Sequence, residues 1–147
     1  MFVASNITNN TSLEPLDTVL SLGADVNAED DDGWTALMYT ARYIDRPDII
    51  NTLIKAGADI DAQDKYGWTA LMHAIYKYNL DCMVALLNAG ADANIKNNEG
   101  ERAIDFKTIK EMQETQRRSS PDFGPALNRQ SYIKRQAVLD LLQSKTK

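Results

Sequence analysis

The chain carries nearly the same eleven residues twice, 34 residues apart. Residues 31–41 read DDGWTALMYTA and residues 65–75 read KYGWTALMHAI. The tripeptide GAD also recurs, with spacings of 34 and 33, and begins at Gly23, Gly57 and Gly90. A fixed period in this range predicts stacked supersecondary units, because each unit buries its apolar face only against a neighbouring unit.

The copy over residues 64–96 shows what one unit contains. Gly67 suits a turn, and Thr69 stands where a helix N-cap belongs. A short helix is predicted over 70–76, because Leu71, Ala74 and Ile75 fall on one face. A second helix is predicted from near Asp81 to the glycine of GAD, a residue type that commonly ends helices. Neither helix is long enough to be stable alone in water.

The segments TALMYTA and TALMHAI, each followed by LIKAGADIDA or LLNAGADANI, resemble the ankyrin repeat. The resemblance implies an all-α solenoid of about four helix-turn-helix repeats with hairpin-like turns. Two positions depart from the family pattern. Ala36 and Ala70 replace its proline, and Met38 and Met72 replace a histidine that ties repeats together by hydrogen bonds. These methionines imply weaker polar links between repeats and more apolar packing.

We interpret residues 1–147 as a single ankyrin-repeat domain with repeats at about 1–29, 30–63, 64–96 and 97–147. The last repeat reads as a cap, with Arg102 at the threonine position and an insertion at about 113–130. Its first helix is expected to run to about Arg117, because no helix breaker interrupts that stretch. A loop over 119–125 and a return helix over about 128–144 should follow, with Phe123 and Leu127 tucked against the helices.

The helical stripes predict a core of aliphatic side chains from all four repeats. It comprises Leu16, Val19, Leu20, Leu37, Ala41, Ile50, Leu53, Ile54, Leu71, Ala74, Val84, Leu86, Leu87, Ile104, Val138, Leu139 and Leu142. Pro47 is expected in the first turn of the second helix of repeat 2, where its missing N–H costs nothing.

Charge is distributed unevenly along the chain. Residues 1–100 hold 6 Lys and Arg against 15 Asp and Glu, whereas residues 101–147 hold 10 against 6. An acidic body argues against nucleic acid as the main partner, since phosphate contacts need cations. Cys82 is the only cysteine, which fits a reducing, cytoplasmic location without excluding a removed signal peptide. No apolar run reaches membrane-span length, and we expect a monomer.

We expect no catalytic residues, no metal site and no cofactor. His73 is the only histidine, and Cys82 would need to contact it to act as a nucleophile. We interpret His73 instead as an inter-repeat packing or surface residue and Cys82 as a small buried hydrophobe. The run EDDDG at 29–33 lacks the oxygen spacing of a calcium loop and reads as a solvated hairpin tip. The GAD carboxylates are expected to bond locally.

The tryptophans suggest a protein-binding role. Trp34 and Trp68 occupy a slot that the resemblance places on the inner, concave side. The predicted partner-binding surface combines them with other hairpin-tip and first-helix-end residues: Asp31, Asp32, Trp34, Arg42, Tyr43, Lys65, Tyr66, Trp68, Tyr76, Lys77, Glu99 and Glu101. Trp, Tyr and Arg are enriched at binding hot spots.

Several alternatives stay open. The indoles could simply pack on neighbouring hairpins and stiffen the stack. The chain could be a structural spacer, or a module of a larger anchoring or host-directed protein. An enzyme hidden in the insertion is a further alternative, and the basic insertion could instead form a second contact site for an acidic partner or another copy of the chain.

Overall fold

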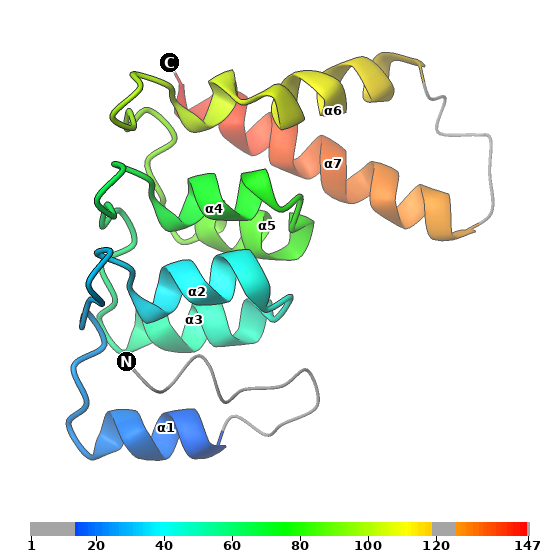
Figure 1. Cartoon of the computed structure of the whole chain (residues 1–147). Coiled ribbons are helices and arrows are strands. Elements are labelled where there is room, and N and C mark those ends of the chain that lie inside the picture. The colour runs from blue at the N-terminus through cyan, green and yellow to red at the C-terminus, as the bar shows by residue number, and fades with distance from the viewer. Residues whose placement is uncertain (1–13, 119–125, 147) are drawn as a thin grey trace.

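The computed structural model describes residues 14–118 and 126–146, which form a stack of helix pairs (Figure 1). Each pair lies beside the next, and the hairpin turns that connect successive pairs project from one side of the stack. No strand occurs within the described residues. The helices are α1 Glu14–Ser21, α2 Ala36–Tyr43, α3 Pro47–Lys55, α4 Ala70–Tyr76, α5 Leu80–Asn88, the 3₁₀-helix η1 Ala103–Asp105, α6 Lys107–Arg118 and α7 Ala126–Lys145.

Local chemistry sets the helix boundaries. The Thr35 and Thr69 hydroxyls accept hydrogen bonds from the backbone N–H groups of Met38 and Met72, so both threonines cap their helices, as was predicted for Thr69. Pro47 is the first residue of α3, also as predicted. One cap was not foreseen: the side-chain oxygen of Asn79 accepts from the N–H of Cys82 at the start of α5.

The core runs along the stack between the two layers of helices. Within it, α2 packs on α4, α3 on α5, and α5 on α7. The predicted aliphatic stripes are mostly buried, and Leu20, Ile54, Val84 and Ile104 are partly buried. Val19 is a wrong prediction, because its side chain is 37% exposed. On the same helix α1, Leu16 is buried and Leu20 is partly buried, so the buried stripe of this helix is narrower than predicted.

Many of the buried residues that were missing from the predicted core are methionines and isoleucines. The buried side chains include Met38, Ile49, Met72, Ile75, Met83, Ile109 and Met112. Met38 and Met72 stand at the family's histidine position and are 1% exposed, so apolar packing does replace the histidine there. Cys82 is fully buried, as expected.

The last helix pair is longer than the others and extends beyond them (Figure 1). The first helix does reach Arg118, but it is not continuous. Phe106 has an extended backbone and separates η1 from α6. The Asp105 carboxylate, which accepts from the backbone N–H and the guanidinium of Arg102, holds η1 in place of a threonine cap. The expected loop over 119–125 and the Phe123 side chain lie outside the described residues, as does the Leu127 side chain.

Candidate functional site

In each of three successive hairpins, one Asp or Asn side chain stabilises the turn. Asp30, Asp64 and Asn97 occupy the same offset, and each Oδ1 accepts backbone N–H groups two and four residues further on, at 2.9–3.0 Å. Short Asp and Asn side chains are favoured in turns because they reach their own backbone. The run at 29–33 was predicted to be a solvated hairpin tip. That prediction is wrong for Asp30, which is half-buried and hydrogen-bonded, whereas Asp31 and Asp32 are exposed.

Neighbouring hairpin tips are joined by the backbone. The N–H of Lys65 donates to the Asp32 carbonyl at 3.1 Å, and the N–H of Asn98 donates to the Tyr66 carbonyl at 3.0 Å. The Lys65 ammonium also pairs with the Asp32 carboxylate. These bonds fix the register of the tips, so the side chains beside them form one surface.

The second carboxylate oxygen of each aspartate accepts from a side chain nine residues later. The Tyr39 hydroxyl donates to Asp30 Oδ2 at 2.6 Å, and His73 Nε2 lies 3.0 Å from Asp64 Oδ2. The hydrogen bond from Tyr39 lowers the pKa of Asp30 and raises that of Tyr39 to about 12. Each turn is thereby tied to its own first helix.

The hairpin anchored by Asn97 has no donor at that place. Phe106 stands nine residues after Asn97 and is buried. An amide at 97 carries no charge that would need a second donor, and its Nδ2 lies 3.4 Å from Glu101 Oε2. The neutral Asn97 therefore occurs where the residue nine positions later, Phe106, has no hydrogen to donate.

The two indoles belong to a column of rings that crosses three repeats. Trp34 lies 5.0 Å from the Tyr39 ring and 4.2 Å from the His73 ring of the next repeat. Trp68 repeats the arrangement, 5.2 Å from His73 and 5.1 Å from Phe106. Ring contacts of this kind contribute beyond the area they bury. The tryptophans are therefore half-buried and partly structural rather than freely exposed.

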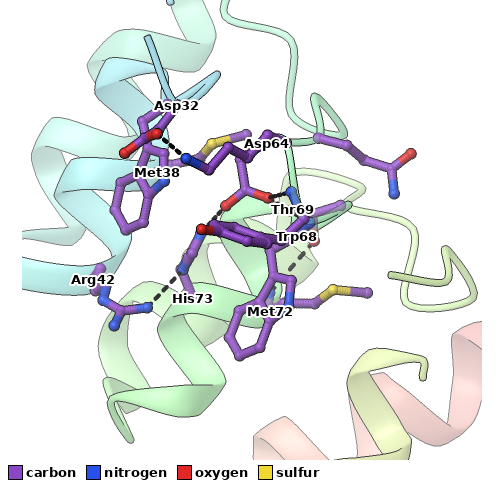
Figure 2. A network of polar contacts seen from close by, with 12 residues as sticks. Asp32, Met38, Arg42, Asp64, Trp68, Thr69, Met72 and His73 are labelled. Atoms are coloured by element: carbon purple, nitrogen blue, oxygen red, sulfur yellow. Dashed lines mark hydrogen bonds and ion pairs between the residues drawn. The ribbon is translucent and has the colours of Figure 1, made fainter. Parts of the chain in front are cut away.

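His73 links two repeats through its two nitrogens (Figure 2). Nδ1 lies 3.1 Å from Arg42 Nη1, which can only donate, so Nδ1 accepts and Nε2 carries the hydrogen that Asp64 receives. Burial lowers the pKa of His73 to about 4, against the opposing effect of the Asp64 hydrogen bond. The ring is therefore neutral at physiological pH, and Asp64–His73 is a hydrogen bond rather than an ion pair.

Arg42 is surrounded by aromatic rings. Its guanidinium carbon lies 5.4 Å from the centre of Trp34, 5.6 Å from that of Tyr43 and 4.8 Å from that of Tyr76. Its Nε atom is buried and has no hydrogen-bond partner. Cation–π contacts hold the guanidinium in place without using all of its N–H groups.

Two clefts meet at Arg42. The larger has a volume of about 390 Å³ and draws its walls from three repeats, namely Trp34, Arg42, Asp64, Tyr66, Trp68, His73, Tyr76, Asn98 and Glu99. The other, about 370 Å³, lies at the ends of α2 and α4 and is lined by Arg42, Tyr43, Asp45, Lys77, Tyr78 and Asn79.

The structure gathers most of the predicted partner-binding residues around these clefts. Tyr43, Tyr66 and Tyr76 expose 60%, 58% and 55% of their surface, and Lys77 is also exposed. Trp34, Trp68, Arg42 and Glu99 line the larger cleft. Asp31, Asp32, Lys65 and Glu101 line neither cleft. Asp31, Asp32 and Lys65 are exposed at hairpin tips, and Glu101 is half-buried.

Sequence reasoning missed the polar residues that support the surface. Asp30, Tyr39, Asp64 and Asn98 were not selected, and His73 was given no polar partner. One signal was available: Asp30 and Asp64 recur at the repeat period, each with a hydrogen-bonding side chain nine residues later.

The arrangement offers no nucleophile beside the histidine. The Cys82 thiol donates to the Ile44 carbonyl at 3.5 Å, and burial raises its pKa to about 12. Across residues 14–118 and 126–146, no three His, Cys, Asp or Glu side chains are grouped so that they could hold a metal ion. The GAD aspartates Asp25, Asp59 and Asp92 each accept a local backbone N–H, as predicted.

A family model described as ankyrin repeats (3 copies) matches residues 1–101. The chain belongs to the ankyrin-repeat family. A comparison with curated proteins gives no match. Membership confirms the all-α repeat solenoid and implies interaction with another protein, in a family that is typically non-catalytic. No helix of this ankyrin-repeat protein, in the part that the structure describes, is long and apolar enough to cross a bilayer.

Proposed function

We propose that this ankyrin-repeat protein is a non-catalytic recognition module that binds another protein through its hairpin tips and first-helix ends. One observation carries the proposal: three successive repeats contribute to a single aromatic cleft of about 390 Å³. Hydrogen bonds between the tips hold its walls in register before any partner arrives. Such preorganisation lowers the ordering cost of binding.

The chemistry of the cleft favours a protein partner. Tyr66 and Tyr76 present large rings at the rim, where Tyr and Trp supply much of the energy of protein interfaces. The acidic body disfavours nucleic acid. We further propose that the protein acts as a monomer, and the lone buried thiol of Cys82 fits a reducing, cytoplasmic setting.

A structural role is the second candidate, and the column of rings favours it. Trp34 and Trp68 each contact rings of two repeats, so part of their value is to stiffen the stack. A spacer or module of a larger anchoring or host-directed protein would need that stiffness but not the exposed tyrosines.

Affinity capture with a Tyr66→Ser/Tyr76→Ser variant separates the two candidates. These side chains are exposed, so their loss should leave the fold intact while removing the captured protein. Ile133→Ser is the matched control, since Ile133 is 53% exposed on α7 and lines neither of the two clefts. Capture that is equally strong with the tyrosine variant, at an unchanged melting temperature, would contradict the recognition function and favour the spacer.

A further inference from the structure

Two cations at the ends of first helices lack a carboxylate partner within the residues that the structure describes. Arg42 bonds only to the neutral ring of His73. Lys77, at the end of α4, lies over the Tyr43 ring with its Nζ 5.8 Å from the ring centre. Both cations therefore contact the same tyrosine ring, because Arg42 also lies 5.6 Å from its centre.

Several other cations of the stack are paired. The structure gives ion pairs for Lys65 with Asp32, for Arg46 with Asp48 and for Lys134 with Asp81. Asp45 lines the same cleft as Arg42 and Lys77, yet it forms no ion pair with either of them. In an acidic body, two cations left unpaired side by side are a distinct local feature.

Arg42 has more donors than its neighbours use. A guanidinium has five N–H groups, and the described hydrogen bonds account for one of them. Its Nε is buried without a partner. Three rings fix the orientation of the group, so an incoming anion would meet a preset donor.

Arg42 also lines both clefts. A ligand that reaches it from the cleft of Tyr43 and Lys77 therefore has the aromatic cleft of Trp34, Trp68 and Tyr76 directly beside it. The charged and the apolar parts of the surface are therefore adjacent, and the Arg42 guanidinium lines both of them.

We infer that this surface binds a protein segment in which an acidic side chain neighbours an aromatic or large aliphatic one. The carboxylate binds between Arg42 and Lys77, and the apolar side chain enters the cleft of about 390 Å³. This rests on the proposed recognition function and specifies the partner's chemistry. A polyphosphate chain is disfavoured, because Asp31, Asp32 and Glu99 are exposed at the tips and would repel it.

To test the inference, short random peptides displayed on phage are selected for binding to the whole protein. Four forms of the protein are used. These are the wild type, Arg42→Leu, Lys77→Leu and the control Lys55→Leu, whose exposed side chain lies on α3 outside both clefts. We expect the wild type and the control to enrich Asp or Glu beside an aromatic or aliphatic residue. Both cleft variants should lose the acidic preference. A selected peptide should then lose affinity about tenfold or more when its Glu is replaced by Gln.

Each outcome decides something. Selected peptides without acidic enrichment, a selection that yields no binder, or a Glu-to-Gln change that alters affinity by less than about twofold would overturn the inference. If Arg42→Leu does not fold, Lys77→Leu decides, because the Lys77 side chain is exposed and lies over the Tyr43 ring. Peptides that still bind the Tyr66→Ser/Tyr76→Ser variant would instead contradict the proposed function itself.

Discussion

Asp64 and His73 lie nine residues apart in the chain and are joined by a hydrogen bond of 3.0 Å between two almost fully buried side chains. The same spacing joins Asp30 to Tyr39. A buried carboxylate needs a donor for each oxygen, since an unpaired buried charge is costly. In these two repeats, turn anchor and first helix therefore depend on each other.

The hairpin anchored by Asn97 allows a direct test of that dependence. Asn97→Asp places a carboxylate opposite Phe106, which has no donor, and should destabilise the protein by roughly 1–3 kcal/mol. Adding Phe106→Tyr should recover part of the loss by recreating the Asp30–Tyr39 pair. Urea unfolding of the two single variants and the double variant measures the coupling, and purely additive effects would contradict the pairing rule.

Acidification should destabilise the protein through His73. Its folded pKa is about 4 against 6.5 unperturbed, so between these values the unfolded chain binds a proton that the folded chain does not. The contribution of neutral His73 to the free energy of unfolding is fully present above pH 6.5. It is lost as the pH falls toward 4, by roughly 3 kcal/mol in total. Urea unfolding across this window measures the slope.

His73→Tyr is the control for the pH slope. It copies the Asp30–Tyr39 pair, keeps a donor for Asp64 and removes the titrating ring. We expect a flatter dependence between pH 6.5 and 4 than in the wild type. If the free energy of unfolding changed equally with pH in both proteins, the loss of stability at low pH would come from titratable groups other than His73.

Two glycines with a positive φ, Gly67 in a hairpin tip and Gly57 just after α3, should differ in their tolerance of alanine. Gly67 has a φ of +77° and a Cβ there would lie 2.8 Å from the backbone N of Asn98, whereas Gly57 has a φ of +95° and nothing within 4 Å. Gly57→Ala should cost roughly 1–2 kcal/mol for the left-handed backbone alone. Gly67→Ala should exceed it by at least about 1 kcal/mol, since the next repeat must shift. Equal melting temperatures would show that the tips are not in close contact.

Core truncation should be costly in the inner repeats. Leu71 and Leu87 are each 1% exposed, and Leu71→Ala or Leu87→Ala should lower the free energy of unfolding by about 2–5 kcal/mol. Leu22 is 82% exposed, so Leu22→Ala is a matched control with an expected change within about 0.5 kcal/mol. Denaturant titration compares the three variants, and equal midpoints would mean that the helix faces are misassigned.

Local signals predicted most of the fold because they act within a few residues. Thr69 caps α4, Pro47 opens α3, and α4 spans the predicted 70–76. The break expected between this helix and the one near Asp81 is present, with Tyr78 at a φ of 60°. Val19 was wrongly assigned to the core, because, among the described side chains of α1, only Leu16 and, in part, Leu20 pack into it.

The period and the helix pairs could be predicted from the sequence alone, because both follow from spacing along one chain, and the resemblance to the family supplied the candidate residues of the binding surface. How those residues are used depends on tertiary contacts. Arg42 and His73 come from different repeats, and nothing in their separation of 31 residues states that a guanidinium will meet a neutral imidazole there. Likewise, the indoles are half-buried because stacking brings Trp34 onto His73 and Trp68 onto Phe106. Contacts between repeats depend on register and rotamer in three dimensions, which a one-dimensional pattern does not encode.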